Sequence, residues 1–196
     1  MTSLRADLAA IADAVPLGAR VLDVGCGDGA LLAALRAEKG VDGRGIELSG
    51  ANVAAAVERG LSVVQGDADA DLADYPSDAF DVAILSDTLQ AMRAPDIVLA
   101  ELLRIARRAV IGFPNFGHWR VRLSLLAGGR MPMTPALPVP WYATPNIHLC
   151  SIDDFRALAA ALDVTVERAT FLSAGKRVTW AGNLRAEQAV FVLRRG

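Results

Sequence analysis

The chain has 196 residues, enough for one domain with a substantial core, and we expect residues 1–196 to form a single domain. Hydrophobic residues make up 53% of the chain and charged residues 21%, a composition that excludes a disordered polypeptide. The net charge of −2 gives no general basic field, so we expect neither nucleic acid nor an anionic membrane as a partner.

The chain carries no sign of export or of a membrane anchor. Residues Met1–Pro16 include Asp7 and Asp13 and lack the basic start and apolar run of a signal peptide. No apolar run reaches the roughly 18 residues that a membrane span needs. Cys26 and Cys150 are too few for a disulfide framework. We therefore expect reduced thiols and a cytoplasmic protein.

Helices and strands are expected to alternate up to residue 113. A helix over Leu4–Val15 ends at Pro16, and a strand follows at 21–24. The further expected elements are the helix Ala30–Lys39 with Gly40 as C-cap, the strand Arg44–Leu48, the helix Gly50–Arg59 with Ser49 as N-cap and Gly60 at its end, the strands Leu61–Gln65 and Phe80–Ser86, the helix Asp96–Arg107 and the strand Ala109–Phe113. This alternation predicts an α/β, Rossmann-like fold with a mostly parallel sheet and helices on both faces.

The alternation stops after Phe113. Both histidines, several aromatic residues and five of the nine prolines lie between Phe113 and Cys150, which predicts an aromatic, proline-rich insertion or lid over 113–150. A short helix is expected at His118–Leu126. The capping pair Ser151/Asp154 then opens a helix over 152–162, and two segments, Val164–Leu172 and Gln188–Arg194, predict a C-terminal antiparallel strand pair.

A glycine-rich stretch, Val21-Leu22-Asp23-Val24-Gly25-Cys26-Gly27-Asp28-Gly29, joins the first strand to the next helix. Glycine permits turn conformations that other residues resist, and the free amides at the start of a helix suit an anionic or polar ligand. Gly25, Gly27 and Ala30 fit the dinucleotide pattern G-x-G-x-x-G/A. The same stretch fits D-x-G-x-G-x-G, which resembles the S-adenosylmethionine (SAM) loop of Rossmann-like methyltransferases.

Asp23 separates these two cofactor classes. A carboxylate here would repel a pyrophosphate, but it can accept a hydrogen bond from the ammonium of a methionyl group. We therefore predict SAM or S-adenosylhomocysteine (SAH) in preference to NAD. A glycine turn without any ligand is the remaining alternative.

Polar residues at the ends of later strands extend the predicted ligand site. Glu47 can accept both ribose hydroxyls of an adenosine, and Asp67 can accept from the adenine amino group while the backbone of Ala68 meets the ring. Each acid can equally be solvent-exposed, and Ser86 and Asp87 can orient a substrate or cap the next turn. The predicted ligand contacts are Asp23, Gly25, Cys26, Gly27, Gly29, Glu47, Leu48, Asp67, Ala68 and Ser86.

Catalytic residues are harder to assign. Methyl transfer from a sulfonium is a direct displacement, so a base is needed only when the acceptor must lose a proton. His118 follows the fifth strand and is the candidate base, with a structural role as the alternative, and His148 is a weaker candidate. These two histidines and Cys150 lack zinc-site spacing, so we predict no metal.

Arginines form two groups. Arg104, Arg107 and Arg108 are expected to end a helix, where cations are favourable. Arg120, Arg122 and Arg130 accompany apolar residues and suit either a partner surface or a lid.

Several segments resemble the MetW family of methionine-biosynthesis proteins, which have a class I methyltransferase fold. The distinctive segments are FPNFGHWRVRL from Phe113, GRMP from Gly129 and ALPVPWYATPNIHLC from Ala136, together with the common loop at 21–32. Ser49 and Gly50 depart from a more polar, acidic pair in the family. The resemblance implies a SAM-binding accessory or regulatory partner of homoserine O-acyltransferase (MetX). The alternative is a SAM-dependent methyltransferase acting on a small molecule.

Overall fold

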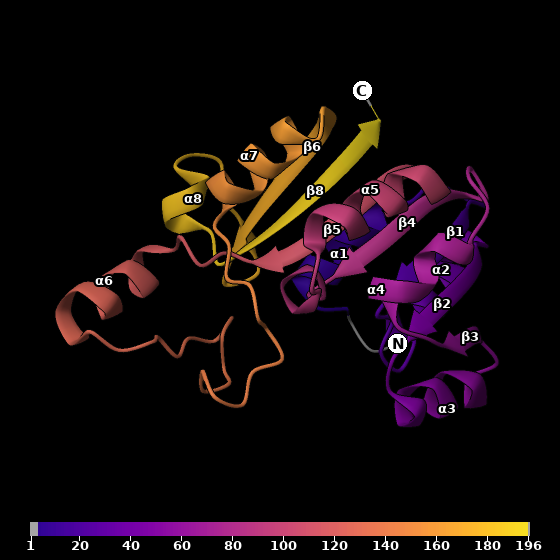
Figure 1. The fold of residues 1–196 in the computed structure, drawn as a ribbon, viewed down its shortest axis with the longest axis horizontal. Helices are drawn as coiled ribbons and strands as arrows, with labels where there is room; N and C mark the ends of the chain where they lie inside the picture. Colours follow the sequence, from indigo (N-terminus) through magenta and orange to yellow (C-terminus); the bar gives the residue numbers. More distant parts are fainter. Residues whose placement is uncertain (1–3, 196) are drawn as a thin grey trace.

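The computed structural model describes residues 4–195, which build one eight-stranded sheet with the order β3-β2-β1-β4-β5-β8-β6-β7 (Figure 1). The strands are β1 (Arg20–Val24), β2 (Asp42–Glu47), β3 (Ser62–Gln65), β4 (Phe80–Ser86), β5 (Ala106–Pro114), β6 (Val164–Ser173), β7 (Lys176–Arg177) and β8 (Gln188–Arg195). The first five strands in this order, β3, β2, β1, β4 and β5, are parallel to one another, and β8 runs antiparallel to both β5 and β6. The predicted fold and its C-terminal antiparallel strand pair are thus confirmed.

Helices cover both faces of the sheet, as predicted. The helices of the described residues are α1 (Ala6–Ala14), α2 (Ala30–Lys39), α3 (Gly50–Glu58), α4 (Ala68–Asp71), α5 (Pro95–Ile105), α6 (Trp119–Gly128), α7 (Ile152–Ala161) and α8 (Gly182–Arg185), with 3-10 turns η1 (Leu72–Asp74) and η2 (Leu89–Ala91). The helices α5 and α7 lie on one face of the sheet, and α1, α2 and α3 lie on the other. None of these helices, within residues 4–195, is long and apolar enough to cross a membrane.

Side chains alternate between two cores, one on each face. In β4, Ala83 and Leu85 join a core formed with α5 and α7, whereas Val82 and Ile84 face a core formed with α1, α2 and α3. This alternation is the period-2 geometry of a strand whose two faces are both buried.

Local sequence signals mark most of the helix ends correctly. Gly40 adopts a left-handed φ of 62° and its N–H bonds to the carbonyl of Arg36, as expected of a C-cap. The Ser49 hydroxyl accepts from the N–H of Asn52, and Ser151 and Asp154 form a complete capping box. The helix after Ser49 ends one residue earlier than predicted, with Arg59 as its C-cap.

The predicted end of the helix before β5 is wrong, and the helix expected at His118–Leu126 is α6, over Trp119–Gly128. The helix expected over Asp96–Arg107 ends at Ile105, and Ala106 already pairs with Phe80 as the first residue of β5. Arg107 and Arg108 therefore belong to a strand, and Arg108 Nε lies 2.9 Å from Glu167 of β6. Pairing with β4 overrides the helical pattern there.

The strand order reverses at β1. After β1 the chain continues through β2 and β3 on one side, and β4 then pairs with β1 on the other. Such a reversal leaves a crevice beyond the carboxyl ends of the two central strands, where ligands of open α/β sheets bind.

The segment between β5 and α7 leaves the body of the protein. It contains α6, which projects away from the sheet, and a proline-rich stretch that returns beneath α6 toward the sheet (Figure 1). Between Gly128 and Ile152 the structure has neither a helix nor a strand beyond one bridge, Thr134 to Leu137.

Candidate functional site

The glycine-rich loop lies at the end of β1, where the crevice begins. Gly25, Gly27 and Gly29 all have left-handed φ angles, of 70°, 56° and 77°. A Cβ on Gly25 would lie 2.6 Å from the hydroxyl of Thr88, so this glycine allows the loop to contact the chain after β4. A Cβ on Gly27 would meet no atom within 4 Å, so the loop is open at this point. A ligand can therefore lie directly on the backbone at Gly27.

Asp23 is buried next to this loop, with 2% of its surface exposed. No hydrogen bond or ion pair within residues 4–195 reaches its carboxyl group. Burial, and then the nearby carboxylate of Glu47, raise the pKa of Asp23 from 3.8 to about 7. A buried carboxylate without a partner is costly, and either a proton or a ligand cation removes that cost, so this site fits a ligand ammonium.

Glu47 ends β2 and faces the same loop. Its Oε2 accepts from the N–H of Gly27 at 2.9 Å, and its Oε1 accepts from the N–H of Ser49 at 2.9 Å and from the amide of Asn52 at 3.4 Å. The carboxylate thus connects the loop to the start of α3. Asp23, the glycine loop and Glu47 are brought together as the sequence predicted.

The Cys26 side chain is buried in the core, whereas the Leu48 side chain is exposed beside the crevice. Cys26 is 9% exposed, and burial, followed by the charges of Asp23 and Glu47, raises the pKa of its thiol to about 12. Its side chain is therefore a neutral core group next to Gly45. Leu48 is 66% exposed directly after β2 and offers an apolar surface beside Glu47.

The acidic segment after β3 is folded, contrary to the alternative of an exposed loop. The N–H of Gly66 bonds to the carbonyl of Glu47 at 3.0 Å, which places the segment beside the end of β2. Asp67 caps α4 by accepting from the N–H of Asp69 at 3.0 Å, and Ala68 packs against the core. The carboxylate of Asp69 in turn accepts from the N–H of Arg93 at 3.0 Å.

Ser86 ends β4, and its hydroxyl lies beside Gly112 of β5. Its carbonyl accepts from the Thr88 hydroxyl at 2.8 Å, and Thr88 contacts the loop at Gly25. Asp87 has a left-handed φ of 55°, and its carboxylate lies 2.6 Å from the Arg5 guanidinium. Burial raises the pKa of Asp87, although the bond to Arg5 opposes this shift. Arg5 was not identified from the sequence, because 82 residues separate the pair.

A cavity of about 470 Å³ lies between the ends of β4 and β5 and the proline-rich stretch. Arg5 and Asp87 supply its charged wall, and most of the remaining lining is apolar. The lining includes Pro114, Phe116, Leu137 and Trp141. The size matches a small-molecule pocket, and Asp87 places it next to the chain that borders the glycine loop.

The two histidines lie outside this cavity. His118 is 4% exposed and caps α6, with Nδ1 accepting from the N–H of Arg120 at 3.4 Å. Burial lowers the pKa of His118. His148 Nε2 lies 3.3 Å from the carbonyl of Arg93. No group of His, Cys, Asp and Glu side chains within residues 4–195 is arranged to hold a metal ion.

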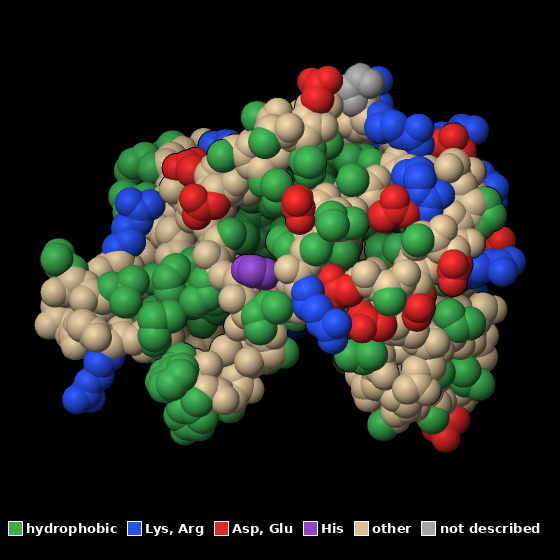
Figure 2. All heavy atoms as spheres, in the orientation of Figure 1, with side chains coloured by type: hydrophobic (Ala, Val, Ile, Leu, Met, Phe, Trp, Pro, Cys, Tyr) green, Lys and Arg blue, Asp and Glu red, His purple; other side chains and the backbone are tan. Residues whose placement is uncertain are grey.

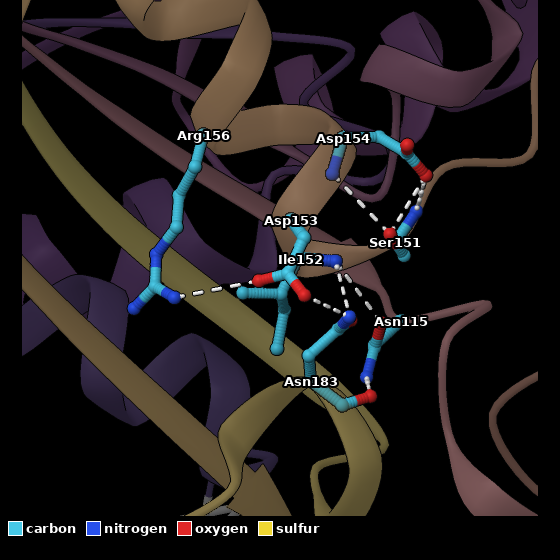
Figure 3. Close-up of polar contacts among 7 residues, drawn as sticks. All are labelled: Asn115, Ser151, Ile152, Asp153, Asp154, Arg156 and Asn183. Atoms are coloured by element: carbon cyan, nitrogen blue, oxygen red, sulfur yellow. Dashed lines mark hydrogen bonds and ion pairs between the residues drawn. The ribbon is translucent and has the colours of Figure 1, made fainter.

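Asn115 fixes the root of the projecting segment and gave no signal in the sequence. It is 2% exposed, its amide donates to the carbonyls of Asn183 and Ala186 at 2.9 and 2.8 Å, and its Oδ1 accepts from the N–H of Ile152 at 3.1 Å. Figure 3 shows this network beside the capping box at the start of α7. The N–H of Phe116 also bonds to the carbonyl of Cys150 at 3.0 Å, so both ends of the segment are tied together.

The strand order, the crevice beside β1 and the glycine loop define a class I methyltransferase-like fold. Solved structures agree. A SAM-dependent methyltransferase from Mesorhizobium loti matches with a TM-score of 0.73 and 18% identity, over 97% of this chain and 98% of its own. Another from Thermotoga maritima, described as a possible histamine N-methyltransferase, matches with a TM-score of 0.70 and 17% identity, over 97% and 88%.

Sequence comparisons assign the chain to a family, which is a more specific class than the fold. The sequence model for "Methionine biosynthesis protein MetW" matches residues 5–193, and this chain belongs to the MetW family. A curated relative from Rhodopirellula baltica, named "Bifunctional methionine biosynthesis protein MetXA/MetW", is 34% identical over 98% of this chain. The chain spans about a third of that relative, since the match covers 33% of its length.

Proposed function

We propose that the protein binds SAM or SAH in the crevice beyond β1, and that it acts as an accessory or regulatory partner of homoserine O-acyltransferase, MetX. The buried, unpartnered carboxyl group of Asp23 is the observation that carries the ligand proposal. It fits the ammonium of the amino-acid end of an adenosyl ligand. A nicotinamide dinucleotide offers no ammonium for this position, and its pyrophosphate would be repelled by the acid.

Other residues of the site have compatible chemistry. The open backbone at Gly27 suits close approach of the ligand, and Glu47 can exchange its present amide contacts for the ribose hydroxyls. Asp67 and Ala68 lie beside Glu47, where an adenine would find a carboxylate and a backbone edge. When SAM is bound, it supplies an electrophilic methyl group on its sulfonium.

The partnership with MetX is supported by the MetXA/MetW relative, in which both names belong to one polypeptide. Fusion makes the two parts permanent neighbours, which favours functions that depend on each other. For this chain, a SAM-binding partner can report the level of a methionine-derived metabolite to the acyltransferase. The projecting α6 segment is compatible with such an interaction.

A second candidate function is methyl transfer to a small molecule, with the 470 Å³ cavity as the acceptor site. Asp87 is placed at the cavity wall to orient an acceptor, and positioning alone can supply much of the catalysis of a displacement. His118 remains a predicted base that requires a test, because its Nδ1 accepts from a backbone amide and its ring lies outside the cavity lining.

Calorimetric titration with SAM, SAH and NADH tests the ligand proposal. We expect one SAM or SAH molecule per chain and no competition by NADH. Binding of NADH alone would refute it.

To test the partnership, the acyltransferase of the same organism is assayed with and without this protein. Unchanged acyltransferase activity together with no association would refute the partnership. Transfer of label from methyl-labelled SAM to a small molecule in cell extract would favour the second function.

A further inference from the structure

The outer face of α6 carries an apolar stripe. Trp119, Leu123 and Leu126 follow the spacing i, i+4, i+7, which places them on one side of the helix. They are 45%, 53% and 87% exposed, whereas Val121 on the opposite side is 2% exposed. The helix therefore packs on its own chain through Val121 and presents a second apolar side outward. This spacing is the one by which a helix inserts into a groove of another protein.

Exposed apolar side chains are concentrated in this part of the molecule. Of the nineteen large hydrophobic side chains that are exposed within residues 4–195, eleven lie between 119 and 149. They are Trp119, Leu123, Leu125, Leu126, Met131, Met133, Val139, Trp141, Tyr142, Ile147 and Leu149. Figure 2 shows hydrophobic side chains gathered over α6 and the loop below it. Clusters of this kind mark interaction surfaces, while single exposed residues do not.

The charged side chains of the segment are all positive. Residues 116–150 contain Arg120, Arg122 and Arg130 and no Asp, Glu or Lys, so they carry +3 in a chain whose net charge is −2. Arg120 is 54% exposed at its side chain, lies 5.4 Å over the ring of Trp119, and has its Nη1 3.9 Å from the carboxylate of Glu187 at the base of the segment. On the face seen in Figure 2, acidic side chains are absent from α6 and from the loop below it. A matching surface would be apolar with a rim of carboxylates.

The segment is held at its root. The side-chain amide of buried Gln90 donates to the carbonyl of Pro114 at 3.1 Å, and its backbone carbonyl accepts from the N–H groups of Ile147 and His148, both at 2.9 Å. Together with the network of Asn115, these bonds fix where the segment leaves and rejoins the body. An arm whose base is fixed loses less conformational freedom on binding.

We propose that the stripe of Trp119, Leu123 and Leu126 docks in an apolar groove with an acidic rim on homoserine O-acyltransferase, an inference that rests on the partnership proposed above. A protein groove is favoured over an anionic membrane. The stripe covers about two turns, and three arginines give only weak attraction to lipid. A second copy of this chain is the other occupant that the experiment must distinguish.

The experiment measures the affinity between the full chain and the acyltransferase of the same organism for wild type and for Leu123→Glu/Leu126→Glu. Both leucines are exposed, so folding should be preserved. The matched control is Leu17→Glu/Ile97→Glu, since Leu17 and Ile97 are 78% and 60% exposed elsewhere on the chain. Urea unfolding and SAM titration of every variant verify that the fold is intact.

We expect the α6 variant to bind at least about thirty-fold more weakly, the loss typical of a hot-spot residue, and the control to bind within about twofold of wild type. Arg120→Glu/Arg130→Glu should weaken binding and reduce its dependence on salt. An acyltransferase complex that tolerates Leu123→Glu/Leu126→Glu would overturn the docking surface and leave the partnership standing. Absence of a wild-type complex would overturn both. Self-association of wild type that the variant abolishes, without an acyltransferase complex, would assign the stripe to a second copy and also overturn the proposal.

Discussion

Replacing Asp23 by Asn should increase the free energy of unfolding and weaken ligand binding. The folded state holds the pKa of Asp23 at about 7, against 3.8 as the ordinary value. A raised pKa means that the folded state favours the protonated carboxyl group. The contribution of Asp23 to the free energy of unfolding is therefore fully present below pH 4 and is lost as the pH rises to about 7. A shift of about three units corresponds to roughly 4 kcal/mol, because each unit is worth 1.36 kcal/mol.

The assay is urea unfolding of wild type and Asp23→Asn at pH 5 and pH 8. The amide is neutral at both pH values, and its burial resembles that of a protonated carboxyl group. The gain in free energy of unfolding should therefore grow from about 2 kcal/mol at pH 5 to about 4 kcal/mol at pH 8. Comparing the two proteins at each pH cancels the titration of all other groups.

The same substitution tests the role of Asp23 in binding. An ammonium pairs with the ionised carboxyl, so the affinity of wild type for SAM should fall by up to about tenfold for each pH unit below 7. In Asp23→Asn this dependence should vanish, and the affinity at pH 8 should drop by at least about tenfold. A variant that is less stable than wild type at pH 8 would contradict the raised pKa of Asp23, and one that binds SAM equally well would remove Asp23 from the ligand site.

Three further substitutions test other parts of the structure. Glu47→Ala removes a charge-assisted contact and should weaken SAM or SAH binding by about 1.5–3 kcal/mol, roughly ten- to hundred-fold, in calorimetry; unchanged affinity would remove Glu47 from the site. Asn115→Ala leaves several buried backbone groups unpaired and should lower the free energy of unfolding by about 3 kcal/mol, whereas a loss below about 1 kcal/mol would contradict its anchoring role. His118→Ala removes the cap of α6 and should cost about 1 kcal/mol in the same assay without changing SAM affinity. Any methyl-transfer activity that disappears in His118→Ala, with stability and SAM affinity unchanged, would support the predicted base instead.

Features written in local sequence were predictable. The loop around Gly25 and Gly27 and the capping box of Ser151 and Asp154 depend on neighbours within a few residues, so their residue types reveal them directly. The approach of Glu47 to that loop also followed, because the carboxyl ends of parallel strands share one edge of the sheet.

Features that depend on distant pairing were not predictable. Arg5 meets Asp87 only because α1 reaches the end of β4, and Asn115 finds its partners 37 and 71 residues away. In the sequence, Arg107 and Arg108 match the pattern of a helix end. Only the pairing of β5 within the sheet places them in a strand. His118 offered two interpretations, and its placement at the start of α6 adds a capping role that its residue type does not suggest.

A crystal structure of the protein with SAH tests directly whether the crevice beside β1 is the ligand site. We predict the ligand ammonium within hydrogen-bond distance of the Asp23 carboxyl, the backbone of Gly27 against the ligand and the ribose hydroxyls on Glu47. A ligand bound elsewhere, or a crevice closed by protein side chains in crystals soaked with SAH, would contradict this binding site.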